Sequence, residues 1–316
     1  MKERGTALLS VLLIVAVMAA IAATALDRLS LSTRLAGNAA VATQGRHWLA
    51  MAEELAQARI ADAAELSGAD QAALLGVERS ITLPDGQTVT ARLDDATNCF
   101  NVNSLVVRRQ TGVLQSQSRR VFQLRDLLGL LGVDAGRAQQ IADSAGDAID
   151  DDSNPRPIGS ERLASGAPVP DRLLTSADEL SAINGMDAQI WASISPYLCA
   201  LPSTEPTSIN VETLSPERAA LIAMLAPETI SLEAARAQLA ARPAQGYGSV
   251  AEFWNMGPLR DFEPSGLRDN QITVETRFFR LTTRVGEGDS ELRSETLFSV
   301  EDGHPRLHAR RWGSAG

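Results

Sequence analysis

The chain opens with an apolar run that contains no charged residue between Thr6 and Leu26. As a helix that rises about 1.5 Å per residue, the run is roughly 30 Å long, which matches the hydrocarbon core of a bilayer. Lys2 and Arg4 precede the run, so the positive-inside rule places the chain after Asp27 outside the cytoplasm. A cleaved signal peptide is the alternative, although its apolar region usually covers about 7–15 residues. The run predicts a membrane-spanning helix over residues 6–26.

The helical pattern continues beyond this run. No proline occurs between residues 27 and 66, and apolar residues recur at helical spacing, as at Trp48, Ala52, Leu55 and Ala56. We therefore expect one long helix that leaves the membrane and occupies residues 27–78.

The pattern of apolar residues then changes three times. Residues 79–112 alternate apolar and polar positions, as at Val89 and Ala91, which predicts strands. Residues 113–257 contain short amphipathic helical segments separated by proline and glycine. Residues 258–316 return to the period of strands. Strands before and after a helical block indicate an all-α insertion inside an antiparallel α+β domain.

Charge and motifs exclude several classes of function. The net charge is −10 and no basic run exceeds two residues, which argues against a nucleic-acid partner. Residues 175–198 resemble a helix-hairpin-helix unit, but the hairpin at 184–187 has no lysine or arginine to bind phosphate. The three histidines are scattered, and no phosphate-binding loop or nucleophile elbow occurs. We expect a protein that is not an enzyme.

The two cysteines, Cys99 and Cys199, both follow the apolar run. In an exported protein such a pair is more often oxidised than bound to a metal. A disulfide that closes a loop of this length stabilises the fold by about 4–5 kcal/mol in the chain-entropy model. We predict a disulfide, with two free buried thiols as the alternative.

One segment of the helical block is strongly acidic and has little apolar content. Asp150, Asp152 and Asn154 take the first, third and fifth places of an EF-hand loop, and Glu161 takes the twelfth. Pro155 stands where that loop requires glycine, so the spacing does not define an EF-hand. It predicts an oxygen-rich loop that binds a hard cation such as Ca²⁺, with a solvated acidic loop as the alternative.

Several segments match a known family in the same order along the chain: residues 4–18, 99–105, 147–161, 173–186, 197–214 and 246–254. A basic leader that ends in glycine, an apolar helix with an amphipathic extension, and a small sheet resemble type IV pilins and type II secretion pseudopilins. The elements "CFNVNSL" and "INVET" resemble in particular the minor pseudopilin K family of the general secretion pathway. The resemblance implies a pilin-like long N-terminal helix packed on a small antiparallel sheet, with a large all-α insertion domain.

The resemblance also implies processing of the N-terminus. In the family, a prepilin peptidase cuts after the leader glycine, here Gly5, and methylates the new N-terminus, here Thr6, so residues 1–5 would be removed. Major pilins carry glutamate as the fifth mature residue, where this chain has Ser10. The K-type lacks this glutamate, so Ser10 is consistent with a tip position; an ordinary polar residue in a membrane helix is the alternative.

The family binds calcium in its helical domain, and its acidic motif positions are present here. Two residues depart from the motif, because Ala148 replaces a tryptophan and Arg162 replaces an aspartate. The combined candidate ligands are Asp147, Asp150, Asp152, Asn154 and Glu161.

By resemblance, the protein is a non-enzymatic minor pseudopilin that caps the tip of the type II secretion pseudopilus and supports export of folded proteins across the outer membrane. The implied partners are minor pseudopilins I and J, other pseudopilins, the prepilin peptidase and the inner membrane, which it crosses once with its bulk in the periplasm. Two alternatives remain: a membrane-tethered, calcium-dependent module that binds exported substrate, and a DNA-uptake pseudopilin.

Overall fold

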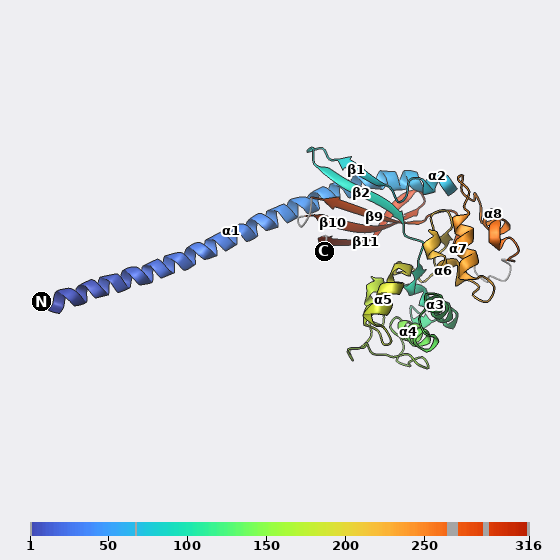
Figure 1. Ribbon diagram of the computed structural model, residues 1–316, viewed down its shortest axis with the longest axis horizontal. Helices are drawn as coiled ribbons and strands as arrows, with labels where there is room; N and C mark the ends of the chain where they lie inside the picture. The colour runs from blue at the N-terminus through green and yellow to red at the C-terminus, as the bar shows by residue number, and fades with distance from the viewer. Residues whose placement is uncertain (1, 67, 264–270, 287–290, 315–316) are drawn as a thin grey trace.

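The chain forms a long stem helix and a body that combines a sheet with a helical block (Figure 1). The computed structural model describes residues 2–66, 68–263, 271–286 and 291–314, and it describes side chains from Val11 onward. The stem is α1 (Lys2–Ala64), and its apolar side chains between Val11 and Val41 are exposed. By length and composition, this helix could cross a membrane.

The last turns of α1 pack on a five-stranded antiparallel sheet in the order β1-β2-β9-β10-β11. Its strands are β1 (Glu78–Thr82), β2 (Thr88–Asp95), β9 (Phe278–Val285), β10 (Leu292–Glu301) and β11 (His304–Ser314). Ala56, Ile60 and Ala63 are three to four residues apart, so they share one helix face, and they pack with Phe279 and Phe298 of the sheet. This apolar face fixes α1 to the sheet.

A partly buried ion pair joins α1 to the last strand. Glu53 is 2% exposed, and its carboxylate accepts hydrogen bonds from Thr296 Oγ1 at 2.7 Å and from Arg310 Nε at 2.9 Å. A second nitrogen of Arg310 binds the other carboxylate oxygen, so the pair is bidentate. A charged pair at this place sets the position of the helix along β11.

We expect Glu53→Ala to lower the free energy of unfolding of the body by about 3 kcal/mol, because it leaves the Arg310 charge partly buried without its partner. Denaturant titration of the full chain in detergent measures this effect. Glu65→Ala is the matched control, since Glu65 is an exposed glutamate just after the end of α1. Equal stability of the two variants would contradict a stabilising role for the pair.

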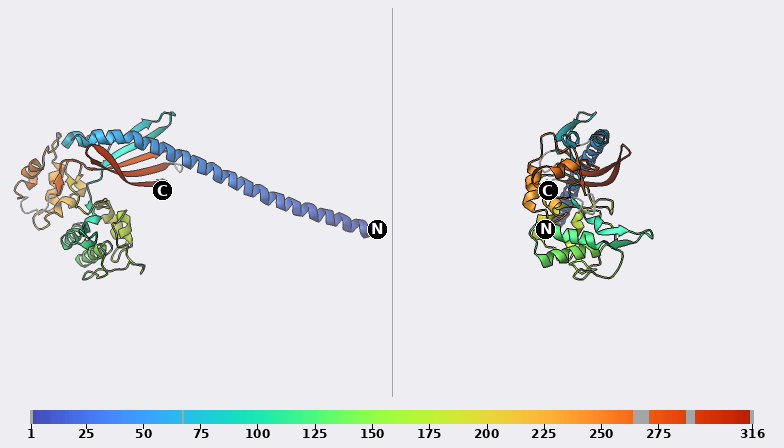
Figure 2. Two further views of the ribbon diagram at one scale, coloured as in Figure 1. Left: turned by 180° about the vertical axis from the view of Figure 1, so that it is seen from behind. Right: turned by 90° about the vertical axis from the view of Figure 1, so that its right-hand side faces the viewer.

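The helical block lies at the end of the sheet away from the N-terminus (Figure 2). Its α-helices are α3 (Ser118–Leu130), α4 (Ala135–Asp147), α5 (Ala188–Ile194), α6 (Ala220–Ala223), α7 (Leu232–Ala240) and α8 (Val250–Asn255). The short helix α2 (Gly68–Ala72) follows α1 and lies outside this block. Its 3-10 helices are η1 (Val102–Leu105), η2 (Ala177–Ala182), η3 (Ser195–Tyr197), η4 (Pro216–Arg218) and η5 (Gly257–Leu259). One large core unites this block.

Three small strand pairs hold the chain around these helices. They are β3 (Phe100–Asn101) with β6 (Leu198–Cys199), β4 (Val106–Arg108) with β5 (Leu114–Ser116), and β7 (Ile209–Asn210) with β8 (Ile272–Thr273). The first and third pairs are parallel and the second is antiparallel. Each pair joins segments of the block to one another, so none extends the main sheet.

The element boundaries differ from those expected from the sequence. The helix predicted to reach residue 78 ends at Ala64, and the chain then turns through Gly68 and Gly76, both with positive φ. Residues 96–112, expected among the first strands of the sheet, belong to the helical block, because β3 and β4 pair within it. The block therefore lies between β2 and β9, over residues 96–263 and 271–277 of the described chain, instead of 113–257. Residue 1 of the predicted leader lies outside the described residues.

Candidate functional site

The acidic segment begins where α4 ends. Asp147, the last residue of this helix, is fully buried. The backbone N–H of Arg156 donates to both carboxylate oxygens of Asp147, at 3.1 and 3.2 Å, and so folds the loop back onto the helix end. Burial raises the pKa of Asp147 to about 6, although the hydrogen bond and charge of Arg156 oppose this rise.

Three carboxylates of the loop converge on one point. One oxygen each of Asp150, Asp152 and Glu161 lies within 4.8 Å of the other two. Burial raises the pKa of Asp150 to about 7, and repulsion from Asp152, Asp147 and Glu161 adds to the rise. Burial also raises the pKa of Glu161 to about 7, with repulsion from Asp147 as the next cause. The folded loop therefore favours either bound protons or a bound cation near neutral pH.

The oxygens of this cluster fit a hard divalent cation. Asp150 Oδ1 and Glu161 Oε1 are buried, and neither has a hydrogen-bond partner. A buried carboxylate oxygen without a partner is costly, and calcium takes several oxygen ligands from flexible loops. Asp150, Asp152 and Glu161 are thus the residues that could hold such an ion.

The other two predicted ligands have different places. Asp147 lies next to the cluster and acts on it through its charge, while its oxygens accept from the Arg156 backbone. Asn154 is exposed, and its backbone N–H donates to Asp152 Oδ1 at 2.8 Å. The backbone of Asn154 therefore positions the candidate ligand Asp152.

Sequence reasoning missed three residues that shape the loop. Arg156 Nε lies 3.0 Å from Asp143 Oδ1, and this ion pair is nearly buried. Gly159 leaves no room for a side chain, because a Cβ there would overlap the Asp147 carboxylate. Asp143 could have been found from its spacing in the sequence, because it precedes Asp147 by four residues and so lies on the same helix face.

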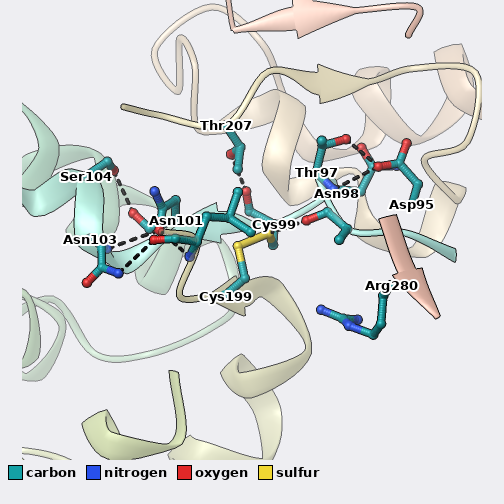
Figure 3. The surroundings of a disulfide bond; sticks show 12 residues. Asp95, Thr97, Asn98, Cys99, Asn101, Asn103, Ser104, Cys199, Thr207 and Arg280 are labelled. Atoms are coloured by element: carbon teal, nitrogen blue, oxygen red, sulfur yellow. Dashed lines mark hydrogen bonds between the residues drawn. A yellow bond between two sulfur atoms is a disulfide. The ribbon is translucent and has the colours of Figure 1, made fainter. Parts of the chain in front are cut away.

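A second structured region joins the helical block to the sheet. Cys99 and Cys199 form a disulfide with Cα atoms 5.8 Å apart, and Figure 3 shows it surrounded by hydrogen-bonded polar residues. Next to it, the Asn101 side-chain nitrogen donates to the carbonyl oxygens of Ser203 and Glu205. These bonds hold the segment after Cys199 against the segment after Cys99.

The Asn103 side chain makes three hydrogen bonds to the backbone in this region. It is completely buried, donates to the carbonyl oxygens of Leu174 and Leu201, and accepts from the Leu174 N–H at 2.8 Å. We expect Asn103→Ala to destabilise the block by about 3 kcal/mol, because it leaves buried backbone groups unpaired. Denaturant titration measures the loss, and Asn38→Ala on the exposed stem is the control. A change below 1 kcal/mol on the same scale would show that these groups find other partners.

A stem helix packed on an antiparallel sheet that carries a helical insertion defines a protein of the pilin-like, pseudopilin class. Comparison with known proteins narrows this class: the family described as type II secretion system, protein K, matches residues 98–203 and residues 209–275. The chain belongs to the type II secretion system protein K family. Both the resemblance and the predicted fold class are confirmed.

Individual relatives agree with this membership. The type II secretion system protein K of Klebsiella pneumoniae is 32% identical over 99% of this chain and 97% of the relative. The protein of the same name from Aeromonas hydrophila is 31% identical over 94% of this chain and 93% of its own. A chain in the crystal structure of the GspK-GspI-GspJ complex from enterotoxigenic Escherichia coli is 26% identical, with a TM-score of 0.71, and the match covers 86% of this chain and 96% of that one.

Proposed function

We propose that this chain caps the tip of a type II secretion pseudopilus, with a structural role in the export of folded proteins and no catalytic one. The observation that carries the proposal is the position of the helical block, at the end of the body opposite the start of the stem (Figure 1). A filament grows by repeating one head-to-tail contact, and each repeat would have to accommodate this block. A single copy at the apex avoids that conflict.

The proposed partners are minor pseudopilins I and J, supported by the related protein that was solved in a complex with GspI and GspJ. We propose a single crossing of the inner membrane by the apolar part of α1, with the body in the periplasm. The prepilin peptidase would cut after Gly5 and methylate Thr6, which both lie in α1 before the first described side chain.

We also propose that the loop binds Ca²⁺ through Asp150, Asp152 and Glu161. The support is the convergence of their oxygens and the two buried oxygens without a partner. The ion would supply positive charge that offsets the carboxylate repulsion, and so would stabilise the loop against α4. Two backbone hydrogen bonds hold the loop in place: the Arg156 N–H donates to Asp147, and the Asn154 N–H donates to Asp152 and orients its carboxylate.

Labelling of assembled filaments tests the tip position. The full chain, with an epitope in the exposed turn between β10 and β11, is produced together with its pseudopilus partners, and a gold-conjugated antibody is located by electron microscopy. We expect gold particles at filament ends, and we expect minor pseudopilins I and J to co-purify with the chain. Gold distributed along the filaments would overturn the tip assignment, and exported substrate as the main co-purifying species would favour a substrate-binding module instead.

The mass of the N-terminal peptide tests the processing. In envelopes that contain the prepilin peptidase, we expect loss of residues 1–5 and a methylated Thr6. Gly5→Val should block this cleavage. An intact leader in the presence of the peptidase, or a cut within the alanine-rich part of the apolar run, would contradict processing by the prepilin peptidase.

A further inference from the structure

A polar pocket of about 520 Å³ opens at the junction between the sheet and the helical block. Three arginines from three different elements line it: Arg92 on β2, Arg280 on β9 and Arg218 at the end of η4. Figure 3 shows Arg280 beside the disulfide segment that joins the two parts of the body. The residues that line this pocket are different from those of the acidic loop, and none of them belongs to the carboxylate cluster.

Of these three arginines, Arg218 has no ion-pair partner among the described residues, whereas Arg92 pairs with Asp94 and Arg280 with Glu295. Its side chain is partly buried, and one guanidinium nitrogen donates to the Asn98 carbonyl oxygen at 3.2 Å. Burial lowers the pKa of Arg218, repulsion from Arg280 lowers it further, and Tyr197 and Asp94 act in the opposite direction. Within the described part of the chain, no carboxylate forms an ion pair with Arg218.

The carboxylates that line the pocket are already engaged. Asp94 Oδ1 lies 2.8 Å from Arg92 Nε. Both oxygens of Asp95 accept from threonine hydroxyl groups. Glu212 is buried and accepts from two backbone N–H groups.

Arg280 forms an ion pair with Glu295 at 3.0 Å, but the Glu295 carboxylate lines the neighbouring pocket and not this one. Arg218 and Arg280 both line the pocket, and the structure shows one hydrogen-bond or ion-pair partner for each. Most of the five N–H donors of each guanidinium group therefore remain for a ligand.

We propose that this pocket binds a carboxylate group of another polypeptide chain, with Arg218 and Arg280 as its principal donors. Guanidinium groups bind carboxylates through paired hydrogen bonds, and a partly desolvated guanidinium binds them more strongly. The pocket is much larger than a carboxylate, and Ala72, Leu75 and Leu214 provide apolar wall for the aliphatic part of an acidic or C-terminal residue. A chain bound here would contact both the sheet and the helical block. The proposal is independent of the calcium site and of the tip position.

Peptide binding to the full chain in detergent tests the proposal. The probe is a fluorescein-labelled Ala-Ala-Leu-Glu peptide with a free C-terminus, and its matched control is Ala-Ala-Leu-Gln amide; fluorescence anisotropy measures both. We expect saturable binding of the acidic peptide, at least about tenfold weaker in Arg218→Gln and in Arg280→Gln. Arg306→Gln should bind normally, because Arg306 is an exposed arginine on β11 that pairs with Glu301.

The melting temperature of each variant separates binding from folding. If Arg218→Gln does not fold, Arg280→Lys replaces it in the test, since it keeps the charge but loses the paired donors and should weaken binding severalfold. Equal affinity for the two peptides, or binding that neither arginine variant weakens, would overturn the proposal. Binding of inorganic phosphate without binding of the acidic peptide would also overturn it, because the site would then recognise a free anion.

Discussion

Replacement of both cysteines, as Cys99→Ser with Cys199→Ser, is expected to lower the free energy of unfolding by about 4–5 kcal/mol. The bond joins residues 100 apart, so its loss frees a long loop in the unfolded chain. In the folded protein, the two sulfur-bearing residues pack with Leu201 and against Phe278 and Leu297 of the sheet. Loss of the bond therefore loosens the place where the helical block is attached to the sheet.

Denaturant titration of the full chain, with tryptophan fluorescence as the signal, measures this effect. Trp191 and Trp254 report on the block, and Trp48 reports on the stem where it meets the sheet. Dithiothreitol should reproduce the loss in the unmodified chain and should leave the double variant unchanged. A double variant within 1 kcal/mol of the unmodified chain would contradict the expected contribution of a closed loop.

The sequence predicted the stem and the general architecture because these depend on periodic patterns. An uncharged run followed by helical spacing is a local signal, and α1 extends through both parts without interruption. The limits of the helical block depend instead on contacts between distant residues. Asn101 and Asn103 bind backbone groups 71 to 104 residues further along the chain, and no local pattern shows that such bonds form.

In the acidic loop, too, some residues could be predicted from the sequence and others could not. Spacing selected Asp150, Asp152 and Glu161, and the structure brings these three carboxylates together. The same spacing gave Asn154 a ligand's place, whereas the structure shows its backbone orienting Asp152. The contribution of Arg156 depends on how the loop folds back over α4, because its ion pair with Asp143 spans thirteen residues. Tertiary contacts of this kind are not visible in one-dimensional spacing.

Calcium is expected to stabilise the folded chain strongly at pH 8 and only weakly at pH 5.5. At a free concentration about a thousandfold above the dissociation constant, the gain in free energy of unfolding is about 4 kcal/mol. The pH dependence follows from the raised pKa values of about 7 for Asp150 and Glu161 and about 6 for Asp147. Below these values, protons occupy oxygens of Asp150 and Glu161 that the ion needs and neutralise the neighbouring charge of Asp147, so calcium binding weakens.

The metal-free chain should show the opposite trend. The unfolded chain has ordinary carboxyl pKa values near 4, so between about pH 4 and 7 the folded loop binds more protons than the unfolded chain does. Stability then falls as the pH rises through this window, and the full cost of the repulsion is present above pH 7. The contribution of this loop should therefore make the chelated protein melt at a higher temperature at pH 5.5 than at pH 8.

Melting curves at both pH values, with calcium and with a chelator, test these two trends together. The variant Asp152→Asn with Glu161→Gln should lose the response to calcium and should melt higher than the chelated unmodified chain at pH 8, because its loop carries less repulsion. Asp62→Asn is the matched control, since Asp62 is an exposed aspartate on α1. A chelated chain that melts at the same temperature as the calcium-loaded chain at pH 8 would refute the calcium site. A calcium response that persists in the double variant would instead place the ion elsewhere.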